Sequence, residues 1–377
     1  MEKTPSKGHG ILPPHVFSGN NYEIGVQHGK AMDLNIKKSW ALYTDKLNPE
    51  QERFDRPFFK KWGLAYLDVI KEFSHDYYDE IRGIAAGANM EPWEISTLNA
   101  RTEIFLRINH SRLSSQPSEC TCLYMPKAGI LGQNWDWMSP CEALMALVEI
   151  DNKKEGIPKI LTLIEPGMLG KIGFNSSGIG ICINILLGLT PPEVGVPIHI
   201  LFRKLLEANS LEEARQTLES VQIGSYSNIL IGDSDGNFMD WECYDRQLVE
   251  LRHDTAEIPV HTNHFVTDKW PAETCPPEVF DIAKMDVYYD NSVTRRNVAL
   301  SIIERNESTE SVDAMKTILF DQSATADPIC KEYDDLWGVQ HGTICTLIMD
   351  LAAGRLHFTN GNPITEQFAL TTYQLTP

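Results

Sequence analysis

Residues 118–137 constrain the fold most strongly, because they have the pattern of two strands joined at Lys127-Ala128-Gly129. A three-residue hairpin loop that ends in Gly sets the register of the strands it joins. We therefore predict a hairpin that is symmetric about Ala128. In this register two polar pairs share one face of the hairpin: Cys120 with Asp136, and Cys122 with Asn134.

The predicted hairpin has a chemical and a structural interpretation. Residues directly opposite on antiparallel strands have Cβ atoms roughly 4.5–5.5 Å apart, so a thiol and a carboxylate could act on one reacting group. The other face carries apolar side chains that can pack in a core: Leu123, Met125, Leu131, Trp135 and Trp137. Free cysteine is among the most buried residue types, so a structural hairpin with incidental cysteines is the alternative.

Composition and charge disfavour several classes of protein. The formal net charge is −19, from 52 acidic and 33 basic residues, which argues against nucleic acid and anionic membranes as partners. Eight cysteines are too few for a disulfide framework in 377 residues. The sequence has no Cys-x-x-Cys or His-Glu-x-x-His motif, so no metal site is expected.

The termini and the apolar runs predict a cytoplasmic protein. The first ten residues lack the apolar segment of a secretion signal, and no apolar run is long enough to span a membrane. The C-terminal Gln-Leu-Thr-Pro differs from a Ser-Lys-Leu peroxisomal signal.

The order of the elements predicts an α+β fold in a single domain, 1–377. Apolar spacing typical of helices extends from about residue 22 to 105, and small residues within 77–88 would let another element approach closely. Residues 106–118 have the composition of a loop, and 266–295 that of a loop or short helix. Further hairpins and helices follow: hairpins at 171–184, 227–242 and 342–360, and helices at 197–220 and 308–320. This order favours layered antiparallel sheets covered by helices.

Cys120 is the strongest candidate nucleophile among the eight cysteines. It follows a polar segment, opens an apolar strand and faces Asp136 in the predicted register. A free thiol has a pKa of about 8.5, so it needs a base near neutral pH.

Two bases are open to this thiol. A histidine of His261-Thr-Asn-His264 could reach Cys120 through the fold. Alternatively, peptide cleavage before Cys120 would free its own α-amine, whose unperturbed pKa is about 7.7–8.0. A polar loop at 106–118 would tolerate such a break.

Eight stretches, in family order, resemble one enzyme family. They are Tyr-Glu-Ile-Gly-Val-Gln-His-Gly (22–29), Tyr-Tyr-Asp-Glu-Ile-Arg-Gly-Ile-Ala (77–85), Leu-Asn-Ala-Arg-Thr-Glu (98–103), Cys-Thr (120–121), Gly-Gln-Asn-Trp-Asp (132–136), Gly-Lys-Ile-Gly-Phe-Asn-Ser-Ser-Gly (170–178), Gly-Val-Pro (195–197) and His-Thr-Asn-His (261–264). The chain resembles the acyl-CoA:6-aminopenicillanic acid (isopenicillin N) acyltransferases. These are cysteine N-terminal-nucleophile (Ntn) hydrolases with a four-layer αββα sandwich.

The resemblance implies a zymogen that activates itself by autocatalytic cleavage. Cleavage before Cys120 would give an α chain of residues 1–119 and a β chain of residues 120–377, which stay together as a heterodimer. Cys120 corresponds to the thiol nucleophile. Asp136 corresponds to a carboxylate that orients the new amine or the substrate, and Asn263 to a donor of the oxyanion hole.

Other positions support the site or depart from the family pattern. Ser225 or Ser227 corresponds to a supporting Ser, and Asn134 is added by the predicted register. Glu119 stands where the penicillin enzyme has Gly, Cys122 where it has Thr, and Pro328 where it has Ser. Specificity for penicillins therefore does not transfer.

The implied activity is N-acyl transfer, with acyl-CoA as a possible co-substrate and no other cofactor, or hydrolysis of an amide. The expected partners are small amides, amines or acyl-CoA. Three alternatives are open: an N-acyl amine hydrolase of the β-alanyl-amine type, a non-catalytic binding module, for which Glu119 is the motive, and a papain-like Cys/His enzyme without processing.

Overall fold

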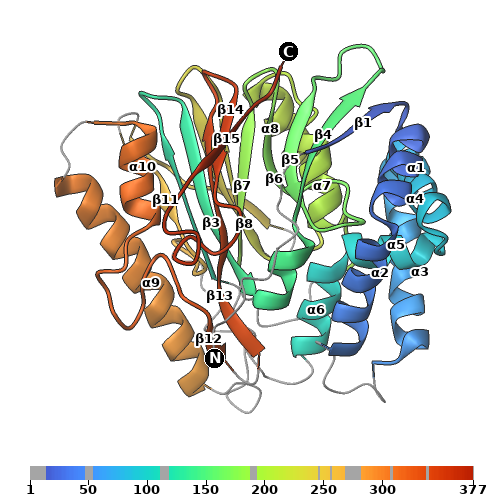
Figure 1. Ribbon diagram of the computed structural model, residues 1–377, viewed down its shortest axis with the longest axis horizontal. Coiled ribbons are helices and arrows are strands. Elements are labelled where there is room, and N and C mark those ends of the chain that lie inside the picture. The colour runs from blue at the N-terminus through green and yellow to red at the C-terminus, as the bar shows by residue number, and fades with distance from the viewer. Residues whose placement is uncertain are drawn as a thin grey trace, which may run out of the picture.

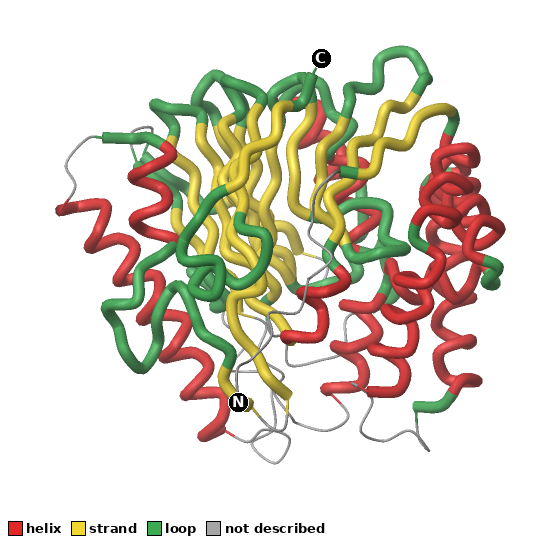
Figure 2. Tube along the Cα trace, in the orientation of Figure 1, coloured by secondary structure: helices red, strands yellow, loops and turns green. Residues whose placement is uncertain are grey.

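The computed structural model consists of two β-sheets packed face to face between two groups of helices (Figures 1 and 2). Helices α9 and α10 cover the outer face of one sheet, and the remaining helices lie beyond the other (Figure 1). The predicted α+β class, with antiparallel sheets covered by helices, is confirmed. The structure describes residues 14–46, 54–110, 119–186, 193–244, 247–254, 257–267, 282–305, 309–336 and 339–376.

Sheet A has the strand order β1-β4-β5-β6-β7-β8-β9-β10. Its strands are β1 (His15–Gly19), β4 (Ala146–Asn152), β5 (Ile160–Ile164), β6 (Ile172–Asn175), β7 (Gly180–Ile185), β8 (Ser227–Gly232), β9 (Phe238–Tyr244) and β10 (Gln247–Glu250). Neighbouring strands are antiparallel, except that β1 runs parallel to β4. The hairpins predicted at 171–184 and 227–242 are confirmed as β6–β7 and β8–β9.

Sheet B has the order β11-β2-β3-β13-β14-β15, and β12 pairs with β13. Its strands are β2 (Glu119–Met125), β3 (Ile130–Met138), β11 (Val260–His261), β12 (Asp334–Leu336), β13 (Val339–Asp350), β14 (Arg355–Phe358) and β15 (Thr371–Gln374). The hairpin predicted at 342–360 is confirmed as β13–β14. The segment 118–137 supplies β2 and β3, so this hairpin holds the middle of the sheet.

The helices follow the predicted α-rich first third and the later helical segments. They are α1 (Asn21–Ala31), α2 (Asp33–Ala41), α3 (Arg56–Phe73), α4 (His75–Ala88), α5 (Pro92–Asn99), α6 (Arg101–His110), α7 (Ile198–Leu205), α8 (Leu211–Ser220), α9 (Ile282–Arg305) and α10 (Val312–Leu319). A π-helical turn follows α2 at Leu42–Lys46, and a 3₁₀ turn follows β3 at Ser139–Leu144.

Two segments are helical in part: 106–118, predicted as a loop, and 266–295, predicted as a loop or short helix. Residues 106–110 belong to α6, whose buried Ile104 and Ile108 pack with Tyr66, so apolar burial outweighs the polar composition. Residues 282–295 belong to α9, which packs Ala299 and Ile302 on sheet B. Residues 266–267 lie in neither a helix nor a strand, as predicted, and 111–118 and 268–281 lie outside the described residues.

The predicted register of the 118–137 hairpin is wrong by one residue. The pair that closes β2 and β3 is Met125–Ile130, so the loop holds four residues rather than three. Pro126 has no N–H to donate to a strand ladder, so pairing stops before it. Gly129 then turns the chain with a left-handed φ of 61°.

The corrected register separates the polar pairs that were predicted to share a face. Trp135, rather than Asp136, lies opposite Cys120. Because side chains alternate along a strand, Cys120 and Cys122 face sheet A, whereas Asp136 and Asn134 face α9 and α10. Contacts confirm these directions, because Cys122 Sγ lies 2.8 Å from Asn184 of β7 and Asn134 Nδ2 donates to a carbonyl of α10.

Sheet B consequently has an apolar core on each face. Leu131 and Trp135 belong to the large core between the sheets, together with side chains of β5, β7 and β8. Leu123 and Met125 belong to a smaller core with α9 and α10. The strand pair that carries Cys120 is thus enclosed on both sides.

Helices α1 and α4 cross in backbone contact, as the small residues of 77–88 predicted. A Cβ atom on Gly83 would lie 2.3 Å from the Tyr22 carbonyl oxygen, and one on Gly25 would lie 2.1 Å from that of Glu80. Such distances are too short for any side chain, so glycine is required at both positions.

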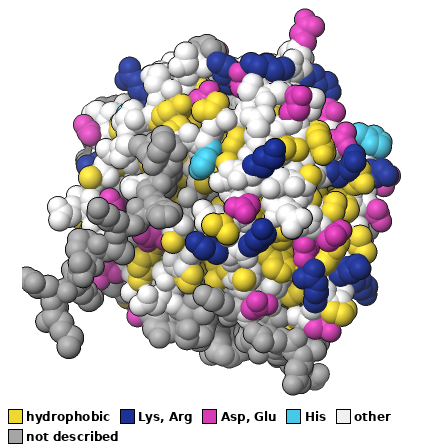
Figure 3. Space-filling model, turned by 45° about the vertical axis from the view of Figure 1, so that its right-hand side comes forward, with side chains coloured by type: hydrophobic (Ala, Val, Ile, Leu, Met, Phe, Trp, Pro, Cys, Tyr) yellow, Lys and Arg dark blue, Asp and Glu magenta, His cyan; other side chains and the backbone are white. Residues whose placement is uncertain are grey.

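Charged side chains of both signs are interspersed over the face shown in Figure 3. Two exposed ion pairs are Lys154 with Asp76 and Arg215 with Glu250. Within the described part of the chain, no helix combines the length and the apolarity that a membrane span requires.

We predict that Gly83→Ala lowers the free energy of unfolding by about 1–3 kcal/mol, because the new methyl group overpacks the α1–α4 contact. Urea unfolding followed by circular dichroism measures the change. The matched control is Arg82→Ala, which removes an exposed pair with Asp79 and should cost less than about 1 kcal/mol. In an uncrowded helix Gly→Ala is stabilising, so a gain in stability would contradict the close contact.

Candidate active site

Cys120 is the second residue of β2 and its backbone is held on both sides. The Cys120 N–H donates to Asn263 Oδ1 at 2.6 Å. The Cys120 carbonyl accepts from Arg295 Nη1 at 2.7 Å. The side chain is 5 % exposed and lies in the core between the sheets. The fold therefore brings Cys120 and Asn263 together.

Arg295, on α9, donates to three side chains of this site as well as to the Cys120 carbonyl. Its Nη2 donates to Asn263 Oδ1 at 3.0 Å and its Nη1 donates to Thr121 Oγ1 at 2.9 Å. Its Nε donates to Asn291 Oδ1 at 2.9 Å, one turn earlier on the same helix. The side chain is fully buried. Because the planar guanidinium makes several bonds in fixed directions, it sets the position of β2 relative to Asn263.

The amide of Asn263 has its oxygen and nitrogen on different partners. Its Oδ1 accepts from Cys120 and Arg295, whereas its Nδ2 donates to the Ile185 carbonyl at 2.9 Å. The Asn263 N–H donates to Ser292 Oγ at 2.7 Å, so α9 also fixes the backbone of this residue.

Both histidines that were considered as bases have other partners. His261 Nε2 lies 2.9 Å from Glu242 Oε1, and its Nδ1 lies 2.8 Å from the Thr262 carbonyl. His264 Nδ1 lies 2.8 Å from Ser292 Oγ. Burial, with a contribution from the neighbouring His261, lowers the pKa of His264 to about 3. His264 is therefore neutral at physiological pH and forms part of a fixed network.

Asp136 lies across the sheet from the thiol and still influences it. Its side chain is fully buried, on the α9 side of β3, and its backbone pairs with Glu119. Burial and the Asp136 carboxylate raise the pKa of the Cys120 thiol to about 12, although Lys171 and Arg295 oppose this. In the continuous chain the thiol is therefore protonated at neutral pH.

Of the remaining predicted site residues, Asn134 lies on the helix side of sheet B, and Ser225 and Ser227 lie beside the site. Asn134 is bound to the carbonyls of Leu319 and Ile329, away from the sheet interface. Ser225 and Ser227 are buried with their Oγ atoms 3.4 Å apart. Ser227 pairs with Ile185, the residue whose carbonyl binds Asn263, so the two serines lie beside the site.

Cys122 ends a chain of buried polar contacts that leads across sheet A. Asn184 Nδ2 lies 2.8 Å from Cys122 Sγ and donates to Asn228 Oδ1 at 3.0 Å. Asn228 donates to Asp240, whose other oxygen lies 2.9 Å from His253 Nε2.

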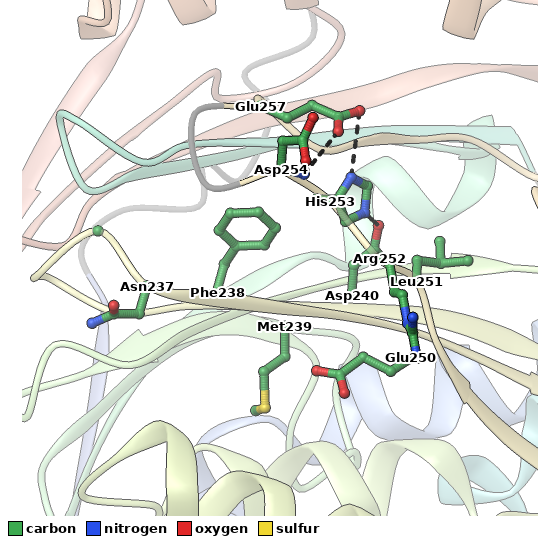
Figure 4. Close-up of a pocket in the computed structure, with 11 residues that line it drawn as sticks. Asn237, Phe238, Met239, Asp240, Glu250, Leu251, Arg252, His253, Asp254 and Glu257 are labelled. Carbon is green, nitrogen blue, oxygen red and sulfur yellow. Dashed lines mark hydrogen bonds and ion pairs between the residues drawn. The ribbon is translucent and has the colours of Figure 1, made fainter.

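The last two residues of this series of contacts, Asp240 and His253, lie at a pocket of about 690 Å³ at the β10 edge of sheet A (Figure 4). His253 and Asp240 line it together with Phe238, Arg252 and Glu257, and Glu257 points toward His253 in the figure. The predicted site residues are not among those that line it. We assign the candidate active site to Cys120 rather than to this pocket.

A buried ion cluster lies on the sheet-A side of Cys120. Glu165 binds Arg101, Lys171 and the Tyr43 hydroxyl. The Lys171 Nζ atom lies 2.9 Å from Glu165 Oε1. The two cations lower the pKa of the Glu165 carboxyl to about 2, against burial, which alone would raise it.

The chain matches the model of one protein family, acyl-coenzyme A:6-aminopenicillanic acid acyl-transferase, over residues 124–365. A protein of Emericella nidulans, the acyl-coenzyme A:6-aminopenicillanic-acid-acyltransferase 40 kDa form, is 31% identical over 260 residues, which cover 67% of this chain and 70% of that protein. The chain belongs to this family. The resemblance predicted from the ordered motifs is confirmed. The matched residues include Asp136 and Asn263 and begin four residues after Cys120.

Several solved structures resemble this chain in backbone but share little sequence identity with it. A mutant of the conjugated bile acid hydrolase from Clostridium perfringens is 13% identical, covers 69% of this chain and 97% of its own, and has a TM-score of 0.45. A Caenorhabditis elegans ortholog of N-acylethanolamine-hydrolyzing acid amidase is 13% identical, with coverages of 68% and 100% and a TM-score of 0.41. Penicillin V acylase from Agrobacterium tumefaciens is 14% identical, with coverages of 64% and 82% and a TM-score of 0.40.

Sequence reasoning did not single out Arg295, Glu165 or Lys171. Arg295 follows Ser-Val-Thr in a segment predicted as loop or short helix, so no local pattern marks it. Lys171 lies inside the family stretch Gly-Lys-Ile-Gly (170–173), so the sequence motif could have identified it as a candidate site residue.

We predict that Glu165→Gln lowers the free energy of unfolding at pH 7 by about 3 kcal/mol, because two buried cations lose their counter-charge. The folded pKa of Glu165 lies below its unfolded value. The contribution is therefore complete above about pH 4.5 and disappears as the pH falls toward about 2. Urea titrations between pH 2.5 and 7 should show the gap between wild type and variant closing on acidification. A constant gap would contradict the assignment, and the exposed Glu155→Gln should show no gap.

Proposed function

We propose that this chain is a self-processing enzyme in which Cys120 becomes an N-terminal nucleophile for acyl transfer or hydrolysis at an amine. The main support is the clamp on the Cys120 backbone, because Asn263 holds its N–H and Arg295 holds its carbonyl. Because these two side chains bind the N–H and the carbonyl of Cys120, they fix the peptide bond between Glu119 and Cys120.

The first reaction would cleave the chain itself. The Cys120 sulfur attacks the Glu119 carbonyl carbon, the C–N bond breaks, and the thiol proton goes to the nitrogen that becomes the α-amine. Water then hydrolyses the thioester, which leaves a carboxylate on Glu119 and restores the thiol.

The new α-amine would serve as the base in turnover. It starts from the nitrogen that already donates to Asn263 Oδ1, so this oxygen can keep the amine beside the thiol. Its unperturbed pKa of about 7.7–8.0 suits a base at neutral pH. This base makes a histidine unnecessary, in agreement with the other partners of His261 and His264.

Asn263, Arg295 and Asp136 would have separate roles during acyl transfer. The oxyanion role of Asn263 requires its Nδ2 to exchange the Ile185 carbonyl for the substrate oxygen. Arg295 would hold the Cys120 carbonyl and Asn263 Oδ1 in place, because its Nη1 and Nη2 atoms donate to them. Asp136 would orient the amine or the substrate, and Cys122, Asn184 and the two serines would support the site around Cys120.

The two cleavage products would stay together as a heterodimer. Buried contacts cross the proposed boundary between residues 119 and 120, including Arg101–Glu165, Glu80–Arg203 and Tyr77–Glu207. The Glu103 carboxylate also accepts from the Ile198 N–H at 2.8 Å.

Cleavage is tested directly on the purified protein. We predict two fragments on a denaturing gel, the larger with the N-terminal sequence Cys-Thr-Cys-Leu-Tyr. Cys120→Ala should stay a single chain, because it removes the sulfur that attacks. Cys243→Ala, at another buried cysteine on β9, is the matched control and should still be cleaved. A wild type that stays intact would sink the processing mechanism.

We predict that Asn263→Ala lowers kcat about 10²–10³-fold, the usual cost of one oxyanion donor. The assay follows CoA release from an acyl-CoA with and without added amines, and amine release from N-acyl amides. Amine-dependent CoA release identifies a transferase, whereas amide cleavage alone identifies a hydrolase. Pre-cleaved protein is used so that slow processing does not mimic slow turnover. Asn237→Ala, on the loop before β9, should leave turnover unchanged, and an equal rate for Asn263→Ala would remove the oxyanion role.

A further inference from the structure

Lys171 is a buried lysine that the reaction above does not use. It immediately precedes β6, and its side chain is 4 % exposed. The ammonium is held by Glu165 and lies 3.0 Å from the centroid of the Trp135 ring. A buried ammonium is costly unless it is paired, and here a carboxylate and an aromatic face provide the pairing.

Trp135 places this ammonium next to the thiol. It lies directly opposite Cys120 on the neighbouring strand, so the two side chains share the face of sheet B that meets sheet A. Lys171 therefore stands over the ring that flanks Cys120. The two groups interact electrostatically, because each shifts the pKa of the other.

The cluster around Lys171 has a net positive charge. Arg101 and Lys171 are cations and Glu165 is the one carboxylate that binds both in the described contacts. Tyr43 and Cys141 are neutral, because burial raises the pKa of each, to about 12 for Cys141. On the opposite face of β2, Arg295 supplies another cation. A thiolate at Cys120 would thus have Lys171 on one face of β2 and Arg295 on the other, while the Asp136 carboxylate, also on the α9 side, opposes both cations.

We propose that Lys171 is the electrostatic partner of the Cys120 thiolate, which stabilises its negative charge and keeps the neighbouring α-amine unprotonated. The inference rests on the proposed function, in which Cys120 is the nucleophile. Both effects follow from one cation, because a positive charge favours a thiolate and disfavours an ammonium. Lys171 acts through the thiol and amine and makes no direct contact with a substrate in this account.

A lysine at this position also limits the enzyme at alkaline pH. Burial and the neighbouring Arg101 lower the pKa of Lys171 to about 8, although Glu165 opposes this. Below about pH 8 Lys171 is charged and supports the thiolate, whereas above it the charge and its effect are lost. The titratable and charged groups that interact with Lys171 are Glu165, Arg101, Cys120, Cys141, His199 and Cys345. His199 is neutral at this pH, because burial holds its pKa well below 6.5.

The test compares Lys171→Met, Lys171→Arg and a surface control, Lys153→Met, in the full chain. The rate of Cys120 alkylation by iodoacetamide is measured from pH 6 to 10 by mass spectrometry of the Cys120 peptide. We expect Lys171→Met to slow alkylation at pH 7 at least tenfold, whereas Lys153→Met should leave it unchanged. Glu165 keeps Arg101 and Tyr43 as partners in Lys171→Met, which favours folding of this variant.

Lys171→Arg supplies a second test that does not depend on the neutral variant. A guanidinium stays charged over the whole range, so the alkaline decline of kcat/KM should move up by at least one pH unit. An alkylation rate in Lys171→Met equal to that of wild type, or a decline in Lys171→Arg that stays near pH 8, would overturn the inference. Activity that survives Cys120→Ala would instead overturn the proposed function. The alkylation rates of wild type and Lys171→Met, which both keep Cys120, would still test the role of Lys171.

Discussion

The buried Arg295 guanidinium is the interaction on which the arrangement around Cys120 depends. It joins a carbonyl of β2, a side chain beside β11 and a turn of α9, which are distant in the sequence. A fully buried cation is tolerated only where its donors are satisfied, so the three elements hold one another in place. Lys331 donates to the same Asn291 oxygen as Arg295, which extends the network to the strand-rich C-terminal part of the chain.

The thiol of Cys120 experiences opposing effects, and burial is the largest. Arg295 and Lys171 favour the thiolate, but desolvation and Asp136 together raise the pKa of the thiol to about 12. In the continuous chain this thiol is a poor nucleophile, and the free amine proposed to follow cleavage would lie beside it. The polar contacts from Cys122 through Asn184 and Asn228 to Asp240 add a rigid support between the sheets.

Patterns that are local in the sequence predicted the fold well. Turn residues located the hairpins of both sheets, and the small residues of 77–88 predicted a close approach by another element, which is α1. The register of the central hairpin failed because one proline, Pro126, cannot join the ladder, and a slip of one residue reverses every side chain. The site was predicted only where a motif carried it: Asn263 reaches Cys120, but Arg295 lies 175 residues away and depends on helix packing that no local pattern encodes.

The buried contacts between residues before and after Cys120 have a consequence for how the protein unfolds and refolds. If the Glu119–Cys120 bond is cut as proposed, the Arg101–Glu165 and Glu80–Arg203 pairs join two molecules rather than two parts of one. Unfolding then separates the pieces, and recovery becomes a second-order encounter that dilution slows. The mature protein would persist because it unfolds slowly, and its lifetime would be set by a rate rather than by an equilibrium.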